Sequence, residues 1–262
     1  MSNYRKSMQP QTQHLTRLRQ LIPLGADGKF DHSVLNTYVD AINNLIPLTA
    51  NINTINRNHF RKARVRRFLS IVDEIIRTKG KCDILDVGGT LAYWQGLEPF
   101  WRDRPVHFTL VNVESEPTQD ERFRSIAGDG RALDQFQDQS FDVVHSNSVI
   151  EHVGGWREQW RMAREIRRLA PRYFVQTPNF WFPLEPHFRV PFIHWLPEPW
   201  RVSILMRWAC GFHPRARSAG EARQMLDDAR LVDARAMREL FPDAVVERER
   251  FAGFTKSLIA VR

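Results

Sequence analysis

A turn that could bind a ligand follows the first predicted strand of the chain. The segment 82–87 (CDILDV) is apolar up to Asp86, and Gly88 and Gly89 come directly after it. Glycine lets a backbone turn sharply and approach a ligand closely. The helix-like segment that follows would offer free N–H groups and a partial positive charge to an anion. The sequence therefore predicts a binding loop at 86–90, with Asp86 as a mere helix cap as the alternative.

Carboxylates also follow the next two predicted strands. Glu114 ends the strand expected at 107–114, and Asp129 lies near the end of the one expected at 123–130. Since parallel strands bring their carboxyl ends to one edge of a sheet, ligands bind there. Glu114 stands 26 positions after Gly88 and could accept hydrogen bonds from both ribose hydroxyls. The alternatives are a solvated Glu114 and an Asp129 that only forms a turn.

The glycine pattern narrows the kind of adenosine ligand. A dinucleotide site requires G-x-G-x-x-G so that a pyrophosphate can rest on the helix. This chain reads Gly-Gly-Thr-Leu-Ala-Tyr from Gly88 onward, without the later glycines. A pyrophosphate is poorly served by such a loop, whereas a single amino-acid carboxylate is not.

The elements that must position these residues alternate between strand and helix. Alternation of this kind is typical of an α/β fold, a parallel sheet with helices on both faces. Two final segments separated by a glycine-containing turn indicate an antiparallel hairpin at the sheet edge. The remaining strands are expected at 141–150 and 173–179, a helix lies between them, and the hairpin is expected at 244–251 and 257–262.

Two parts of the chain lie outside this alternation. Residues 1–80 lack strand signals, and apolar spacing predicts helices at 32–46 and 60–81. The stretch 180–213 is dense in aromatic residues, proline and histidine, and is too long for a simple connection. We expect an N-terminal helical extension at 1–80 and a main domain at 81–262, with a cap segment at 180–220 over its site.

Composition limits the class of protein. The 262 residues are 42% hydrophobic, and no run approaches the ~18 apolar residues of a membrane span. Cys82 and Cys210 make neither a disulfide framework nor a metal cluster, which predicts a cytoplasmic protein. The net charge is +8, but the arginines alternate with apolar positions at helical spacing. They read as solvated helix faces, so nucleic acid is not the expected partner.

Five motifs together resemble a known family. "DILDVGGT", "VNVE", "GDGRAL", "FDVVHSNSVIEHV" and "FVQTPN" occur in the order and spacing of class I S-adenosylmethionine-dependent methyltransferases. The similarity is greatest to the bacterial small-molecule branch, and it covers residues 82 to about 179. It implies a Rossmann-like fold, S-adenosylmethionine as cofactor and a small-molecule acceptor.

The resemblance also assigns roles to individual residues. It places the first motif beside the methionine part of the cofactor and Glu114 at the ribose. Asp129 would bind the adenine amino group, with its neighbours flanking the ring, and Asn147 would face the sulfonium. Thr90 stands where many members have another glycine. The implied cofactor residues are Asp86, Gly88, Gly89, Thr90, Glu114, Asp129, Gly130, Arg131 and Asn147.

The acceptor chemistry depends on a base. A hydroxyl acceptor must lose a proton, and an imidazole titrates in the range that suits this task. His152 follows the fourth predicted strand and is the expected base, oriented by Glu151, although it could equally pack the start of the next helix. Some quinone O-methyltransferases hold a metal here with an ExxEH run. Ser148 replaces the first Glu, so we expect no metal.

The aromatic stretch suggests where an acceptor would bind. So many rings beside a cofactor cleft indicate an apolar or planar acceptor, which a lipid-linked molecule would also satisfy. Structural packing is the competing reading for its histidines. An RNA or protein methyltransferase and a non-catalytic binding protein remain open, and the N-terminal helices could pair two subunits in a homodimer. The expected acceptor-binding residues are Trp181, His187, His194 and Trp195.

Overall fold

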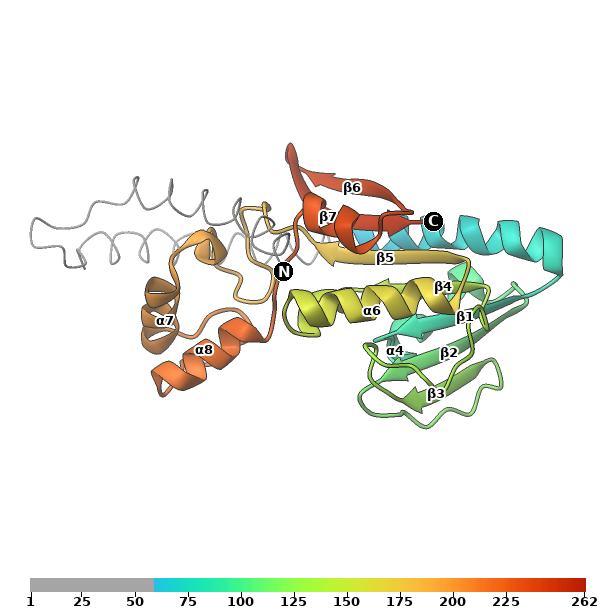
Figure 1. Cartoon of the computed structure of the whole chain (residues 1–262), viewed down its shortest axis with the longest axis horizontal. Helices are drawn as coiled ribbons and strands as arrows, with labels where there is room; N and C mark the ends of the chain where they lie inside the picture. Colours follow the sequence, from blue (N-terminus) through green and yellow to red (C-terminus); the bar gives the residue numbers. More distant parts are fainter. Residues whose placement is uncertain (1–58) are drawn as a thin grey trace, which may run out of the picture. The chain divides into compact units, whose positions relative to one another are not determined.

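A seven-stranded mixed sheet forms the centre of the protein, in the order β3-β2-β1-β4-β5-β7-β6 (Figure 1). The computed structural model describes residues 59–262, so the helix predicted at 32–46 lies outside the described residues. β1 to β5 are parallel, and β7 runs antiparallel to both β5 and β6. The predicted α/β fold with a C-terminal hairpin is thereby confirmed. The strands are β1 (Cys82–Val87), β2 (Val106–Asn112), β3 (Phe123–Ala127), β4 (Val143–Asn147), β5 (Arg172–Pro178), β6 (Val245–Phe251) and β7 (Phe254–Val261).

Helices cover both faces of this sheet, and each face has its own apolar core. One face packs against a helix at 59–79 and the two short helices that follow β1. The other face packs against a helix that buries Met162, Ala163 and Ile166, and against a later helix near the hairpin. The helices of the sheet unit are α4 (Leu91–Gln95), α5 (Glu98–Trp101), α6 (Trp156–Leu169) and α9 (Ala234–Leu240), with the 3₁₀ turn η1 (Ile150–His152).

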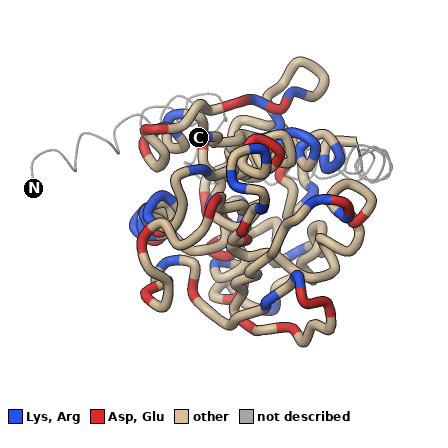
Figure 2. The backbone as a smooth tube through the Cα atoms, turned by 90° about the vertical axis from the view of Figure 1, so that its right-hand side faces the viewer, with Lys and Arg blue, Asp and Glu red and all other residues tan. Residues whose placement is uncertain are grey.

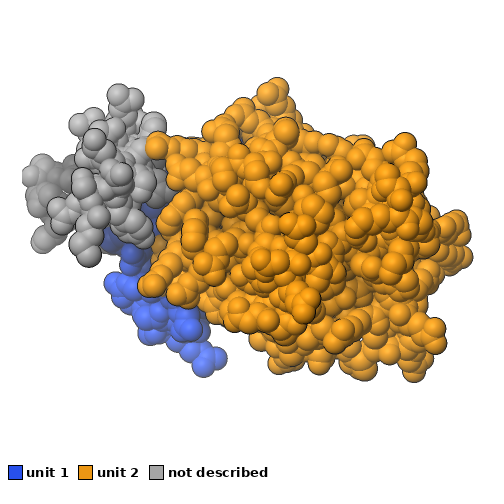
Figure 3. All heavy atoms as spheres, turned by 45° about the vertical axis from the view of Figure 1, so that its right-hand side comes forward, with its two compact units in different colours: residues 1–54, 183–225 blue, residues 55–182, 226–262 orange. Residues whose placement is uncertain are grey.

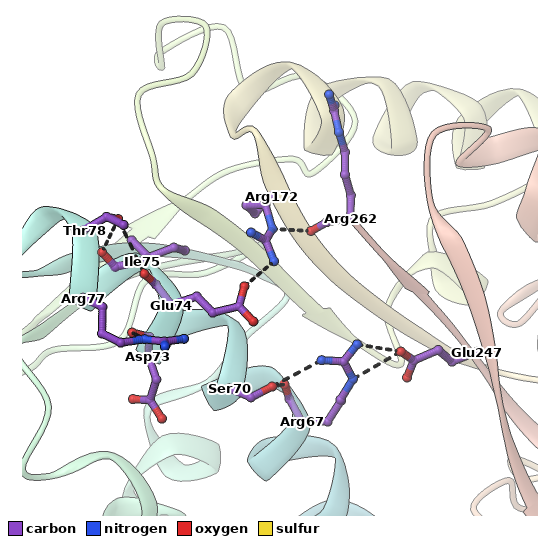
Figure 4. A network of polar contacts seen from close by, with 10 residues as sticks. All are labelled: Arg67, Ser70, Asp73, Glu74, Ile75, Arg77, Thr78, Arg172, Glu247 and Arg262. Atoms are coloured by element: carbon purple, nitrogen blue, oxygen red, sulfur yellow. Dashed lines mark hydrogen bonds and ion pairs between the residues drawn. The ribbon is translucent and has the colours of Figure 1, made fainter.

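The helix at 59–79 is fastened to the sheet by ion pairs along its length. Arg67 Nη2 lies 2.8 Å from Glu247 Oε1 on β6, and Glu74 Oε2 lies 3.1 Å from Arg172 Nη2 on β5 (Figure 4). At its last turn, Lys79 Nζ lies 2.5 Å from Asp142 Oδ1, just before β4 begins. The first turn of this helix therefore lies over the end of the sheet where the parallel strands finish.

The chain divides into two compact units (Figure 3). Residues 55–182 and 226–262 hold the sheet, and residues 183–225 belong to the other unit. Within the second unit, the buried carboxylate of Glu185 accepts hydrogen bonds from the backbone of His187 at 2.7 Å and of Phe188 at 2.5 Å. Its helical elements are η2 (Ile193–Trp195), α7 (Glu198–Arg207) and α8 (Ala219–Asp227), the last of which ends in the sheet unit.

Both cysteines are buried, which leads to a first testable expectation. Burial raises the pKa of the Cys82 thiol to about 12 and that of the Cys210 thiol to about 11. A thiol of pKa about 12 carries about one part in ten thousand of thiolate at pH 8, and the thiolate is the reactive form. We expect a colorimetric thiol reagent at pH 8 to react with neither cysteine in the folded protein and with both after denaturation. Rapid labelling of either thiol in the folded protein would contradict the burial of that cysteine.

None of the helices within residues 59–262 combines the length and the apolar character that crossing a membrane requires.

Candidate active site

The residues expected to bind a ligand gather at one edge of the sheet. We call it the carboxyl edge; there β1, β2, β3 and β4 end at residues 87, 112, 127 and 147. The strand order β3-β2-β1-β4 places the segments after these strands next to one another. Gly88 N donates to Val111 O at 2.7 Å, and Gly128 N donates to Asn112 O at 2.8 Å. These bonds join the loops after β1 and β3 to β2.

The turn after β1 requires its two glycines for different reasons. Gly88 has φ +79°, in the left-handed region that side chains disfavour, and a Cβ there would overlap Val149. A Cβ on Gly89 would instead overlap the carboxylate of Asp86. The turn is therefore pressed against the loop after β4 on one side and against Asp86 below.

Asp86 is buried beneath this turn and holds two side chains. Its Oδ2 accepts a hydrogen bond from Trp94 Nε1 at 2.7 Å, and its Oδ1 lies 2.9 Å from His145 Nδ1. Asp86 and His145 are register partners on β1 and β4, and the ring of His145 stacks with Phe174. Sequence reasoning missed Trp94 and His145 as partners of Asp86. In the sequence, the only signal for His145 was its place in the segment predicted as the fourth strand.

The helix after the turn uses its own N–H groups locally. Thr90 caps α4 and its Oγ1 accepts from Tyr93 N at 3.2 Å. Glu116 Oε2 accepts from Leu91 N at 2.9 Å. With five residues and these two donors engaged, α4 offers an anion far less than the sequence suggested.

Glu114 lies two residues beyond the end of β2, in an open pocket. The pocket is lined by residues 112–116, and the side chain of Glu114 is exposed. In the same pocket, Asn112 Oδ1 accepts from Val113 N at 2.8 Å. An exposed carboxylate at this position can accept hydrogen bonds from a bound diol.

Asp129 forms a tight pair with Arg131 in the loop after β3. Arg131 Nη2 lies 2.7 Å from Asp129 Oδ2, and Arg131 N donates to Asp129 Oδ1 at 2.9 Å. The Arg131 side chain thereby lowers the pKa of the Asp129 carboxyl. A Cβ on Gly130 would lie 2.7 Å from Val87, so this loop packs directly against β1. Arg131 also donates to Val153 O at 3.2 Å, which links the loops after β3 and β4.

An arginine from the helix at 59–79 reaches the end of β4. Arg64 Nη1 donates to Asn147 Oδ1 at 2.7 Å, and Arg64 Nε lies 3.3 Å from Glu249 Oε1 on β6. The next residue, Ser148, has φ +58°, and its hydroxyl donates to Gln176 at 3.0 Å. Sequence reasoning did not find Arg64, because it lies outside the segment that carries the motifs.

The two residues expected to serve acid–base chemistry follow β4. His152 is exposed, and its Nδ1 lies 2.8 Å from the carbonyl oxygen of Asp228. A carbonyl can only accept, so Nδ1 carries the proton and Nε2 is the basic nitrogen of the neutral ring. Glu151 is buried, and its Oε2 accepts from Thr177 Oγ1 at 2.9 Å.

The four expected acceptor residues fall in both units. Trp181 belongs to the sheet unit, is 41% exposed and donates weakly to Asp233 at 3.4 Å. The other three lie in the second unit. There His187 Nδ1 is 2.7 Å from Glu185 Oε1, and the rings of His194 and Trp195 lie 5.3 Å apart.

A segment that contributes to the carboxyl edge matches a known protein family. Residues 105–172, from the start of β2 into β5, match the family model described as "Methyltransferase domain". This segment of the chain is similar to the methyltransferase domain that the model describes. S-adenosylmethionine is the cofactor of such a domain, and the exposed Glu114 and the open pocket beside it fit the ribose of that group.

Relatives of the methyltransferase domain are distant. The uncharacterized protein Rv1509 of Mycobacterium tuberculosis (strain ATCC 25618 / H37Rv) is 34% identical over 61 residues, 23% of this chain and 21% of the relative. The chain thus spans about a fifth of the length of the curated relatives it matches. The carbon methyltransferase DszA matches at 13% identity over 78% of this chain and 54% of that chain, with a TM-score of 0.49. A SAM-dependent methyltransferase from Archaeoglobus fulgidus matches at 12% identity over 78% of this chain and 94% of that chain, with a TM-score of 0.47.

Proposed function

We propose that the protein transfers a methyl group from S-adenosylmethionine to a hydroxyl of a small molecule, as members of the bacterial small-molecule branch do. The observation that carries this proposal is the orientation of His152. Its Nδ1–H is used by Asp228 O, so Nε2 is the nitrogen that can take a proton. His152 lies in the turn that directly follows β4, at the same edge as the cofactor residues.

The cofactor supplies an electrophilic methyl group on a sulfonium, and the protein supplies position and a base. Glu114 accepts hydrogen bonds from the ribose hydroxyls. Asp129, flanked by Gly130 and Arg131, binds the adenine, and Asn147 faces the reacting centre. Asp86 lies beneath the glycine turn, and its hydrogen bonds with Trp94 and His145 hold its carboxylate in place there. His152 Nε2 would take the proton of the acceptor hydroxyl while the hydroxyl oxygen bonds to the methyl carbon and the bond from that carbon to sulfur breaks, with S-adenosylhomocysteine as the leaving group. Positioning alone can contribute about 7–11 kcal/mol to such a reaction.

The acceptor proposed is apolar or planar, and lipid-linked molecules belong to this class. The exposed ring of Trp181 would contact it. Among the described residues, basic and acidic side chains are interspersed along the backbone (Figure 2). Many arginines are paired with carboxylates, such as Arg104 with Asp73 and Arg167 with Asp243. This distribution favours a small molecule over RNA as the acceptor.

Two measurements test the proposal. Isothermal titration with S-adenosylhomocysteine should show stoichiometric binding to the full chain, and NAD should not bind. Release of S-adenosylhomocysteine should then be recorded with a panel of phenols, catechols and isoprenoid quinols, and with bulk RNA. Binding without turnover on any acceptor would indicate a non-catalytic protein, and turnover on RNA alone would replace the small-molecule proposal.

Loss of the charge on Glu114 should weaken cofactor binding. Glu114→Gln removes the charged acceptor of the ribose hydroxyls, and hydrogen bonds to charged groups contribute about 1.5–3 kcal/mol. We expect the dissociation constant for S-adenosylhomocysteine to rise about tenfold or more in calorimetry. Glu121→Gln, at an exposed residue of the same β2–β3 connection, is the control and should leave the constant unchanged. Equal affinities of wild type and Glu114→Gln would remove Glu114 from the site.

A further inference from the structure

A cofactor with an amino-acid carboxylate needs a cationic or N–H partner near the turn after β1. The sequence favoured the helix that follows the turn as this partner. In the structure, however, Leu91 N is engaged by Glu116 and Tyr93 N by Thr90. The carboxylate of Asp86 beneath the turn is no partner for an anion either. A positive charge for this carboxylate can come from another element that lies beside the turn.

Arg61 supplies a guanidinium at this place. Its Cζ lies 5.8 Å from the centroid of the Tyr93 ring, within the range of a cation–π contact. Tyr93 belongs to α4, the helix that begins directly after the glycine turn. Arg61 is exposed, and among residues 59–262 it has neither a hydrogen bond nor an ion pair with a carboxylate. Its charge is thus available to a ligand.

The electrostatics around Tyr93 agree with this placement. Burial raises the pKa of the Tyr93 phenol, and Asp86 adds to the rise. Arg64 and Arg61 both act in the opposite direction. The guanidinium groups of both arginines therefore lie close enough to Tyr93, in the helix after the turn, to act on its phenol.

The position of Arg61 is fixed by its neighbours on the same helix. Arg64, one turn further on, binds Asn147 at 2.7 Å and Glu249 at 3.3 Å. Arg67 binds Glu247 on β6, and the polar contacts continue down the helix (Figure 4). Arg61 is thus presented by a helix that is anchored to β4 and β6, and the ordering cost of its backbone is already met on folding.

We propose that Arg61 binds the carboxylate of the amino-acid part of S-adenosylmethionine, with Arg64 as the positioning residue that holds the helix against β4. The inference rests on the proposed function, because it assigns a residue to the same cofactor. It places part of the cofactor site in the helix that precedes the motif-bearing segment.

A pair of ligands isolates this contact. S-adenosylhomocysteine has the amino-acid part, whereas 5′-methylthioadenosine has the same adenosine and sulfur without it. Arg61→Ala should raise the dissociation constant for S-adenosylhomocysteine about tenfold, because a charge-assisted hydrogen bond is lost. The constant for 5′-methylthioadenosine should change less than about twofold. Both are measured by calorimetry on the full chain.

Two further variants serve as controls. Arg66→Ala removes an exposed guanidinium of the same helix, which stacks on Phe100 with its Cζ 5.4 Å from the ring centroid. It should bind both ligands like wild type. Arg61→Lys keeps the charge and should recover part of the lost affinity for S-adenosylhomocysteine.

The outcomes separate this inference from the proposed function. If wild type binds neither ligand, the proposed function fails and the inference fails with it. If wild type binds both but Arg61→Ala loses affinity for neither, or for both equally, only the carboxylate assignment is overturned. Selective loss of S-adenosylhomocysteine in Arg61→Ala, with Arg66→Ala unaffected, supports it.

Discussion

Replacing Asp86 with alanine is expected to lower the free energy of unfolding by about 2–6 kcal/mol, since each buried donor left without an acceptor costs about 1–3 kcal/mol. The two donors are Trp94 Nε1 and His145 Nδ1, and all three side chains are buried. Phe68 and Phe174 pack against the imidazole and offer no acceptor in place of the carboxylate. Urea denaturation followed by tryptophan fluorescence measures the change. Asp86→Asn, which keeps one acceptor oxygen, should fall between alanine and wild type.

The matched control for Asp86 lies on the same strand. Asp83 pairs with Lys81 at 3.0 Å and with His107 at 3.3 Å, in contact with solvent. Exposed pairs contribute little to stability, so Asp83→Ala should shift the urea midpoint far less than Asp86→Ala. If the two alanine variants are equally stable, the buried contacts of Asp86 do not have the role proposed for them.

Replacing His152 with alanine should lower kcat by about 10²–10⁴, the range typical of a lost general base. The assay is release of S-adenosylhomocysteine with the best phenol or catechol of the acceptor panel. The affinity for S-adenosylhomocysteine itself should stay within about twofold of wild type, since the base acts on the acceptor.

A histidine far from the carboxyl edge provides the comparison. His107 is exposed near the start of β2, at the opposite end of the sheet, and His107→Ala should leave kcat unchanged. An unaltered kcat in His152→Ala would show that this residue only packs the turn after β4.

The parallel strands could be predicted because burial on both faces makes them short apolar runs bounded by turns. The segment 82–87 coincides with β1, and the expected hairpin corresponds to β6 and β7. The residues at which the strands end were predicted less accurately. β2 stops at Asn112 and β3 at Ala127, so Glu114 and Asp129 lie in loops rather than at strand termini. The last paired residue of a strand and the first residue beyond it can have the same sequence pattern. The sequence therefore does not show at which residue the strand ends.

The site could be predicted only where a motif marks it. Glu114 was expected from its place after a strand; it lies exposed in a pocket, and its role in binding stays a prediction. The partners of Asp86 did not follow, because packing brings His145 to it from 59 positions away. Arg61 and Arg64 carry no local signal either, as their spacing fits an ordinary solvated helix face. The methyltransferase expectation, in contrast, is supported by the family match for residues 105–172.

The contact between Asp86 and Gly89 means that these two positions cannot vary independently. A side chain at 89 would occupy the space of the carboxylate oxygen that Trp94 needs, so any larger residue there requires a smaller or shifted one at 86. Homologues should therefore show the acid and the second glycine changing together, while the first glycine is kept both by its φ of +79° and by its contact with Val149. The two glycines of this turn therefore answer to two different neighbours. Gly88 is limited by Val149 in the loop after β4, and Gly89 is limited by Asp86 on β1.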